Sequence, residues 1–193
     1  YAVAATGMAN PTKSQILSKV VTSVNRVDGV YETDVAVRLM LVANDTVVLY
    51  GNAASDPFNG NNNAGTLINE SQTVINANIG SANYDIGHTF STGGGGLAML
   101  GCVCGSSKAR GITGSPSPVG DPYDIDYVAH EVGHNMGAGH DGSPCPTSGF
   151  IMASVLNVGS PPSLFSTCSK DYFVAFYQSE GLGCSGCQGG GCQ

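Results

Sequence analysis

Three histidines and one glutamate lie within a single stretch from residue 130 to residue 140 of this 193-residue chain. His130 and His134 are four positions apart, so on a helix their imidazoles share one face, with Cβ atoms about 5 to 6 Å apart. Two imidazoles at that separation can bind one metal ion, and they suit zinc better than magnesium or calcium. Glu131 lies about 100° round the helix from His130, bordering the ion without ligating it. The pattern therefore indicates a metal site with a carboxylate beside it.

His140 can supply a third imidazole only if the helix ends before it. On a continuous helix, His140 would lie roughly 9 Å further along the axis than His134 and on the wrong side. Gly137 and Gly139 are the residues able to take the left-handed conformation that turns a chain back. We therefore expect His130, His134 and His140 to hold Zn²⁺, leaving a fourth coordination position open.

Composition and charge restrict what else the protein can bind. Lys and Arg total 7 against 14 Asp and Glu, a net charge of −7, so neither nucleic acid nor an anionic membrane is an expected partner. No apolar run approaches the roughly 18 to 20 residues needed to cross a bilayer. Seven cysteines and 28 glycines are typical of a secreted, loop-rich domain with disulfides. We expect a monomer whose signal peptide or pro-segment has already been removed, because the chain opens without Met or an apolar leader.

Hydrophobic periodicity and turn residues predict the elements of the first half of the chain. Asn10-Pro11 is typical of a helix start, and alternating apolar residues are typical of strands. Asn44-Asp45 suits a hairpin turn, and the residues from 56 to 63 have the composition of a turn. In order, we predict a strand over 1–6, a helix from Asn10-Pro11, strands over 35–41 and 47–50, and a helix from Leu67 to Ile75.

The second half contains the histidine motif on a helix that begins at Asp121-Pro122 and ends at Gly137 and Gly139. His88 falls on an apolar strand face, where a hydrogen-bonded core histidine is the favoured interpretation. The other predicted elements are strands over 84–90 and 97–100, a Gly/Ser/Pro-rich loop over 101–120, and a short last helix around Phe173 to Tyr177. This order of elements predicts an α/β fold with a mixed sheet, formed by one domain over residues 1–193.

The string from His130 to His140 resembles the signature of the metzincin zinc endopeptidases, H-E-x-x-H-x-x-G-x-x-H followed later by a methionine turn. Asp141, directly after the third histidine, resembles the reprolysin or adamalysin branch, which includes the snake-venom metalloproteinases and the ADAM proteases. The likeness continues in Gly96-Leu97-Ala98 with Gly101 and Cys104, in Ile151-Met152-Ala153, and in Phe165-Ser166-Thr167-Cys168-Ser169. It covers most of residues 84 to 184, whereas the first 80 residues match only in the order of elements.

The resemblance implies a metzincin-like, mostly parallel sheet with helices in an upper lobe of about 1–137, and a small irregular lower lobe of about 138–193. Met152 would form a floor beneath the zinc, and Asp141 and Gly137 would have structural roles near the site. Ser154 to Pro162 would wall the main specificity pocket. An extended peptide would pair with an exposed strand, whose residues are Gly96, Leu97, Ala98, Met99 and Leu100.

The resemblance also implies two disulfides, Cys145 with Cys168 and Cys104 with Cys184. Cys102 and Cys187 lack counterparts in that branch and are predicted to form a third pair, which leaves Cys192 over. A second zinc bound by Cys102, Cys104, Cys184 and Cys187 is an alternative that a secreted setting disfavours. Many members bind a structural calcium through an acidic residue in the first strand. Residues 1–6 contain none, so calcium is doubtful.

The interpretation is a secreted zinc endopeptidase that cleaves protein substrates. Zinc would activate the attacking water and polarise the scissile carbonyl, while Glu131 would accept the proton and pass it to the leaving amine. Two alternatives stay open: a catalytically silent protein that keeps the metal and acts as a binding module, and a zinc hydrolase for bonds other than peptides.

Overall fold

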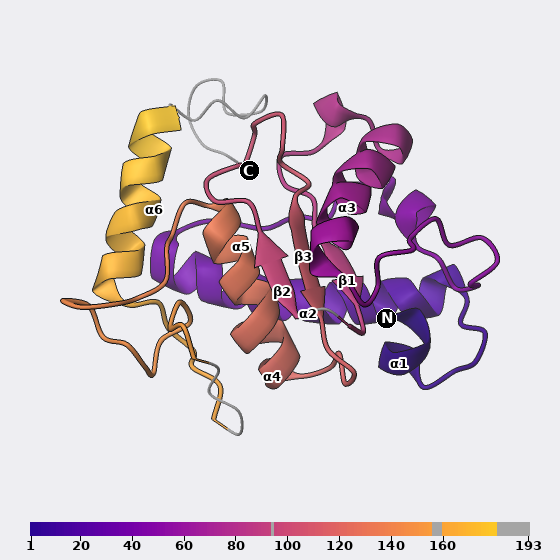
Figure 1. The fold of residues 1–193 in the computed structure, drawn as a ribbon, viewed down its shortest axis with the longest axis horizontal. Coiled ribbons are helices and arrows are strands. Elements are labelled where there is room, and N and C mark those ends of the chain that lie inside the picture. The colour runs from indigo at the N-terminus through magenta and orange to yellow at the C-terminus, as the bar shows by residue number, and fades with distance from the viewer. Residues whose placement is uncertain (94, 156–159, 181–193) are drawn as a thin grey trace.

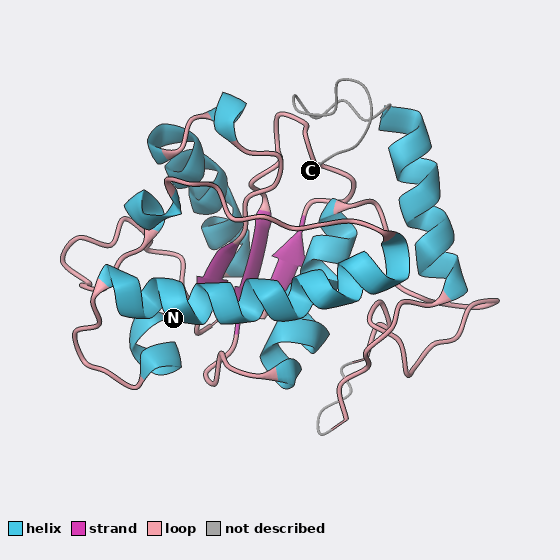
Figure 2. Cartoon of the chain, turned by 180° about the vertical axis from the view of Figure 1, so that it is seen from behind, coloured by secondary structure: helices cyan, strands magenta, loops and turns pink. Residues whose placement is uncertain are grey.

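The computed structural model describes residues 1–93, 95–155 and 160–180 and contains a small mixed sheet between layers of helices (Figure 1). The strands are β1 (Thr89–Ser91), β2 (Gly96–Ala98) and β3 (Gly111–Gly114), in the order β1-β3-β2. β1 runs parallel to β3, and β2 runs antiparallel to it. Seen from behind, the long helix α2 crosses one face of this sheet (Figure 2), while α3 and α5 lie on the other. The predicted α/β class with a mixed sheet is confirmed, and one of its two pairings is parallel.

The strand predicted over 1–6 is wrong, because these residues form the short helix α1 (Ala2–Thr6). Three of its five residues are alanine, the strongest helix former. The hydroxyl of Thr6 donates to the carbonyl oxygen of Ala2 at 2.7 Å, and Gly7 ends the helix with φ of 69°. Local propensity therefore outweighs the apolar pattern that suggested a strand.

Helix α2 (Lys13–Val35) begins at a capping box in which the side chains of Thr12 and Gln15 satisfy each other's backbone amides. It begins close to the predicted position and continues to Val35, the first residue of the predicted strand over 35–41. That strand is wrong: the amide of Val37 donates to the carbonyl oxygen of Tyr31, and the amide of Leu39 donates to the carboxylate of Asp28. These amides are satisfied by α2, so no partner strand takes them.

The strand predicted over 47–50 is also wrong, since Asp45–Val48 forms a 3₁₀ helix. A second 3₁₀ helix follows at Ser81–Asn83. Between them, α3 (Ala64–Asn78) confirms the predicted second helix, and the side chain of Asn63 caps its first turn by accepting from the amide of Thr66 at 3.0 Å. The strand predicted over 84–90 contracts to β1.

Strand β3 lies within the segment predicted to be a loop over 101–120, which is therefore partly wrong. Ile112 and Thr113 are fully buried, because β3 is the central strand and is covered on both faces. A strand buried on both faces shows no alternation of polar and apolar residues, and this one consists of Gly-Ile-Thr-Gly. Gly111 and Gly114 are of a residue type common in loops, which is why a loop was predicted here.

The largest cluster of buried apolar side chains joins distant parts of the chain. Three of its fully buried side chains come from separate segments: Tyr31 from α2, Met152 from the loop after the histidines, and Phe173 from the last helix, α6 (Thr167–Glu180). The rings of Tyr31 and Phe165 meet edge to face, with centroids 5.0 Å apart. This core lies beneath the helix that carries the histidines. Among the described residues, no helix combines the length and the apolar character needed to span a bilayer.

Candidate metal centre

The histidine helix is continuous from residue 121 to residue 135. It consists of α4 (Asp121–Tyr123), a π-helical segment (Asp124–Ala129) and α5 (His130–Asn135). Arg26 of α2 anchors its first turn by two hydrogen bonds to the carboxylate of Asp121, at 2.8 and 2.9 Å. π-helical turns are frequent at functional sites, and here the wider turn directly precedes His130.

The structure brings together the three predicted ligand histidines. The Nε2 atom of His140 lies 3.1 Å from Nε2 of His130 and 3.2 Å from Nε2 of His134. Four ligands arranged tetrahedrally at zinc–nitrogen distances of about 2.05 Å are about 3.3 Å apart, so these separations fit one zinc ion. The three rings come from the helix and from the loop that follows it, as the spacing predicted.

Backbone carbonyls set the tautomers of the two helical histidines. Nδ1 of His130 lies 2.6 Å from the carbonyl oxygen of Ile151, and Nδ1 of His134 lies 2.7 Å from that of Ala138. A carbonyl oxygen only accepts hydrogen bonds, so each Nδ1 carries the proton and each Nε2 turns its lone pair toward the centre. Burial lowers the pKa of His130 to about 4 and also lowers that of His134. Neutral imidazoles with converging lone pairs are what a divalent cation requires.

The helix ends at a single glycine. Gly137 has φ of 94°, and the amide of Ala138 donates to the carbonyl oxygen of Gly133 at 3.0 Å. Gly139 has no positive φ, so only one of the two glycines expected to turn the chain takes the left-handed conformation. A Cβ at Gly137 would also lie 3.0 Å from Cβ of Phe176 on α6.

Glu131 is 7% exposed, and burial raises the pKa of its carboxyl group to about 8. Its side chain lies directly against the backbone of Gly96, the first residue of β2. The helix α5 and the strand β2 lie next to each other (Figure 1). The predicted catalytic carboxylate therefore extends from the histidine helix toward the strand predicted to bind substrate.

The residues predicted to bind substrate lie on and just after β2, which is an edge strand. Leu97, Met99 and Leu100 are 39%, 38% and 58% exposed. The amide of Met99 donates to the carbonyl oxygen of Arg110, so the strand is fixed to the sheet on its inner side. Gly96 and Ala98 complete the set.

Met152 is fully buried under α5. A Cβ added at Gly133 would lie 2.5 Å from Sδ of Met152, so the methionine packs in the space that this helical glycine leaves. The carbonyl oxygen of Met152 accepts from the amide of Asp141 at 2.8 Å. Met152 therefore underlies the helix and links to the residue after the third histidine.

Asp141 joins the loop that carries His140 to α6 through Ser166 and Ser169, two residues for which the sequence predicted no role. Its Oδ1 accepts hydrogen bonds from the hydroxyls of Ser166 at 2.7 Å and Ser169 at 2.9 Å, and all three residues are buried. The only available signal was that both serines lie at the start of the predicted last helix, one on each side of Thr167-Cys168.

Asn135 is a third residue whose role the sequence did not predict. Its Nδ2 donates to the carbonyl oxygens of Met99 and Arg110, both at 3.0 Å, and lies 3.2 Å from Sγ of Cys102. It is fully buried and ties the end of α5 to β2. Nothing in its sequence position distinguishes it from other polar helix residues.

The cysteines agree only in part with prediction. Cys145 and Cys168 form a disulfide, whereas Cys102 is a free thiol, so its predicted pairing with Cys187 is wrong. Cys102 is buried beside Asn135, a setting that encloses its sulfur. Cys104 is disulfide-bonded, and its expected partner Cys184 lies outside the described residues. The same holds for Cys187, Cys192 and part of the segment from Ser154 to Pro162.

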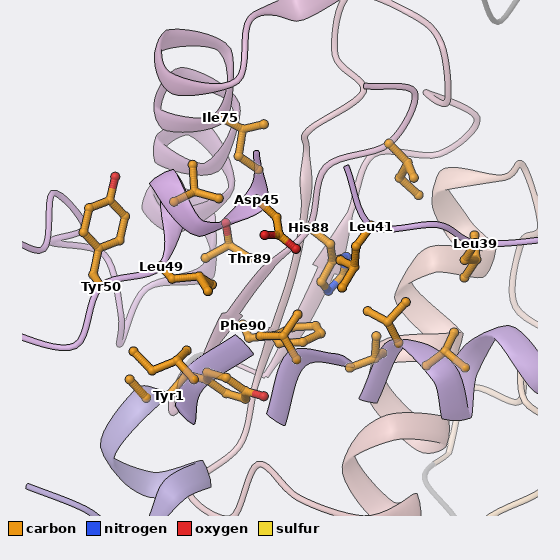
Figure 3. Close-up of a pocket in the computed structure, with 18 of the residues that line it drawn as sticks. Tyr1, Leu39, Leu41, Asp45, Leu49, Tyr50, Ile75, His88, Thr89 and Phe90 are labelled. Carbon is orange, nitrogen blue, oxygen red and sulfur yellow. The ribbon is translucent and has the colours of Figure 1, made fainter. Parts of the chain in front are cut away.

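A cavity of about 280 Å³ lies away from the three imidazoles, among α2, β1 and the chain from residue 39 to residue 50 (Figure 3). Leu41, His88 and Phe90 line it. Nε2 of His88 lies 2.7 Å from Oγ1 of Thr113, so His88 is a hydrogen-bonded residue of the core, as predicted. None of the predicted metal ligands reaches this cavity.

Comparison with known proteins agrees with this geometry. The family model described as Metallo-peptidase family M12B Reprolysin-like matches residues 17–141. Similarity also extends to a zinc metalloproteinase/disintegrin from Craspedocephalus gramineus, 40% identical over 57 residues, which make up 30% of this chain and 13% of that relative. The chain thus matches only a small part of that relative's length. Because the family match runs from α2 through the sheet to all three histidines, the chain belongs to the reprolysin-like M12B family of metallopeptidases.

Proposed function

We propose that this chain is the catalytic domain of a secreted zinc endopeptidase that acts as a monomer on extended segments of protein substrates. The domain would comprise an upper lobe of about residues 1–137 and a lower lobe of about 138–193. The convergence of three Nε2 atoms, two of them oriented by backbone carbonyls, is the observation that carries the proposal. Family membership supports it.

His130, His134 and His140 would hold the zinc ion. When bound there, Zn²⁺ supplies Lewis acidity, which lowers the pKa of water toward about 7 and polarises a carbonyl oxygen. Glu131 accepts the proton of the attacking water on its carboxylate and delivers it to the leaving amine. Burial raises the pKa of Glu131, and a general base works best when its pKa lies close to the working pH.

The substrate would bind as an added strand on the free edge of β2. Main-chain hydrogen bonds from an edge strand hold any sequence, and side-chain pockets then select among sequences. The exposed side chains of Leu97 and Leu100 would contact substrate residues. By family resemblance, the segment from Ser154 to Pro162 would wall the main specificity pocket.

Casein digestion with and without a chelator, combined with metal analysis, tests the proposal. We expect about one zinc per chain, cleavage of casein into fragments, and loss of cleavage when the zinc is removed. Zinc without cleavage of any denatured protein would instead identify a binding module. Turnover of small amides with long peptides left whole would identify a hydrolase of another class.

A further inference from the structure

The side chain of Glu131 lies against the backbone of Gly96 in β2, in the space where any other residue would have its Cβ. A Cβ built at Gly96 would lie 2.5 Å from Cδ and 2.8 Å from Cγ of Glu131, with the nearer carboxylate oxygen closer still. Ordinary carbon–carbon contacts are about 3.5 to 4.0 Å. Gly96 does not have a positive φ, so the backbone conformation itself does not require glycine here. What requires glycine is the space occupied by the carboxylate.

The strand cannot withdraw to make room for a side chain at this position. Gly96 pairs with Thr113 of the central strand β3, and the amide of Gly101 donates to the carbonyl oxygen of His134 at 2.9 Å. Asn135 binds the carbonyl oxygen of Met99 from α5. β2 is therefore held to the central strand, and the residues directly after it are held to the same helix that carries Glu131.

The side chain of Glu131 is the part that can give way. It has rotatable bonds, and the atoms nearest to Gly96 are a carboxylate oxygen, Cδ and Cγ, so a shift of roughly 1 Å in these atoms relieves the overlap at little cost to the fold. Catalysis is less tolerant, because a misplacement of about 1 Å can cost about 10²-fold in rate.

Resting on the proposed function, we propose that Gly96 is a positioning residue for the catalytic carboxylate. The bare backbone of Gly96 allows the carboxylate of Glu131 to lie against β2, beside the edge where the substrate would bind. A methyl group at Gly96 would push the base away from the reacting atoms while leaving the three imidazoles in place.

Gly96→Ala tests this inference in the zinc-loaded protein. We expect kcat on a peptide substrate to fall about 100-fold, with KM changed less than about two-fold and with zinc content and Tm retained. Gly29→Ala is the matched control, because a Cβ at this glycine of α2 meets nothing within 4 Å. An unchanged kcat, a loss confined to KM, or a variant that loses zinc or fails to fold would overturn the inference.

Two further measurements separate this inference from the proposed function. In a Glu131→Ala background, Gly96→Ala should reduce the residual rate no further, because the group it displaces is already gone. A crystal structure of zinc-free Gly96→Ala should show the carboxylate of Glu131 displaced by about 1 Å and the backbones of β2 and α5 unmoved. A displaced backbone would contradict the inference, whereas a displaced carboxylate would support it even if the parent protein cleaves nothing.

Discussion

The side-chain amide of Asn135 donates a hydrogen bond to the carbonyl oxygen of Met99 at 3.0 Å, so the last residue of the histidine helix holds the end of the edge strand. Asn135→Ala would leave the carbonyl oxygens of Met99 and Arg110 without this donor in a buried place. We expect a loss of about 2 to 4 kcal/mol in the free energy of unfolding, measured by urea denaturation. The control is Asn78→Ala, which removes an exposed amide from α3 and should cost less than about 0.5 kcal/mol. Equal losses from both variants would show that the link contributes nothing.

Asp141 should govern zinc affinity through the position of the neighbouring His140. Asp141→Ala removes the acceptor of the Ser166 and Ser169 hydroxyls, and we expect zinc affinity to fall about 10- to 100-fold in competition with a chromogenic chelator. Asp141→Asn keeps an oxygen that can accept from both hydroxyls and should lose much less. Equal affinity in Asp141→Ala and the parent would contradict this role.

Burial lowers the pKa of His88 to about 3, so the residue stays neutral in the folded protein but takes up a proton near pH 6.5 when unfolded. The unfolded state then binds more protons below pH 6.5. The contribution of His88 to stability is therefore complete above pH 6.5 and is lost as the pH falls toward 3. Unfolding of the metal-free protein should lose up to about 1.4 kcal/mol per pH unit below pH 6.5 from this residue. In His88→Gln, the same urea series should show a shallower slope, and identical slopes would refute the assignment.

Glu131→Ala should retain zinc and the fold while losing about 10²- to 10⁴-fold in kcat, the usual contribution of general acid–base catalysis. Substrate cleavage and metal content are measured on the same sample. Glu32→Ala, which removes an exposed glutamate from α2, serves as the control and should cleave at the parental rate. Parental activity in Glu131→Ala would exclude the carboxylate as the base.

The metal site was predictable because its geometry is local. A spacing of four within one helix places His130 and His134 together whatever the rest of the chain does, and a single glycine turn, at Gly137, suffices to return His140. The links that hold this site to the sheet are not local. Asn135 contacts residues 25 and 36 positions away, and no spacing within its own helix reports them.

The strands were predicted less well than the helices for a related reason. β3 consists of Gly-Ile-Thr-Gly and becomes a strand through its two neighbours, so its own residues show no strand signal. The segment over 35–41 shows the opposite case, in which an alternating pattern meets no partner strand. Its amides are instead satisfied by Tyr31 and Asp28 of α2. The capping box and the Asn63 cap are local, and α2 and α3 begin close to where they were predicted.

Anomalous diffraction at the zinc absorption edge tests the coordination chemistry most directly. The account predicts one anomalous peak within about 2.0 to 2.1 Å of Nε2 of His130, His134 and His140, with no fourth protein ligand. A zinc-loaded crystal with no peak among these three rings, or with the ion bound through Nδ1, would contradict it.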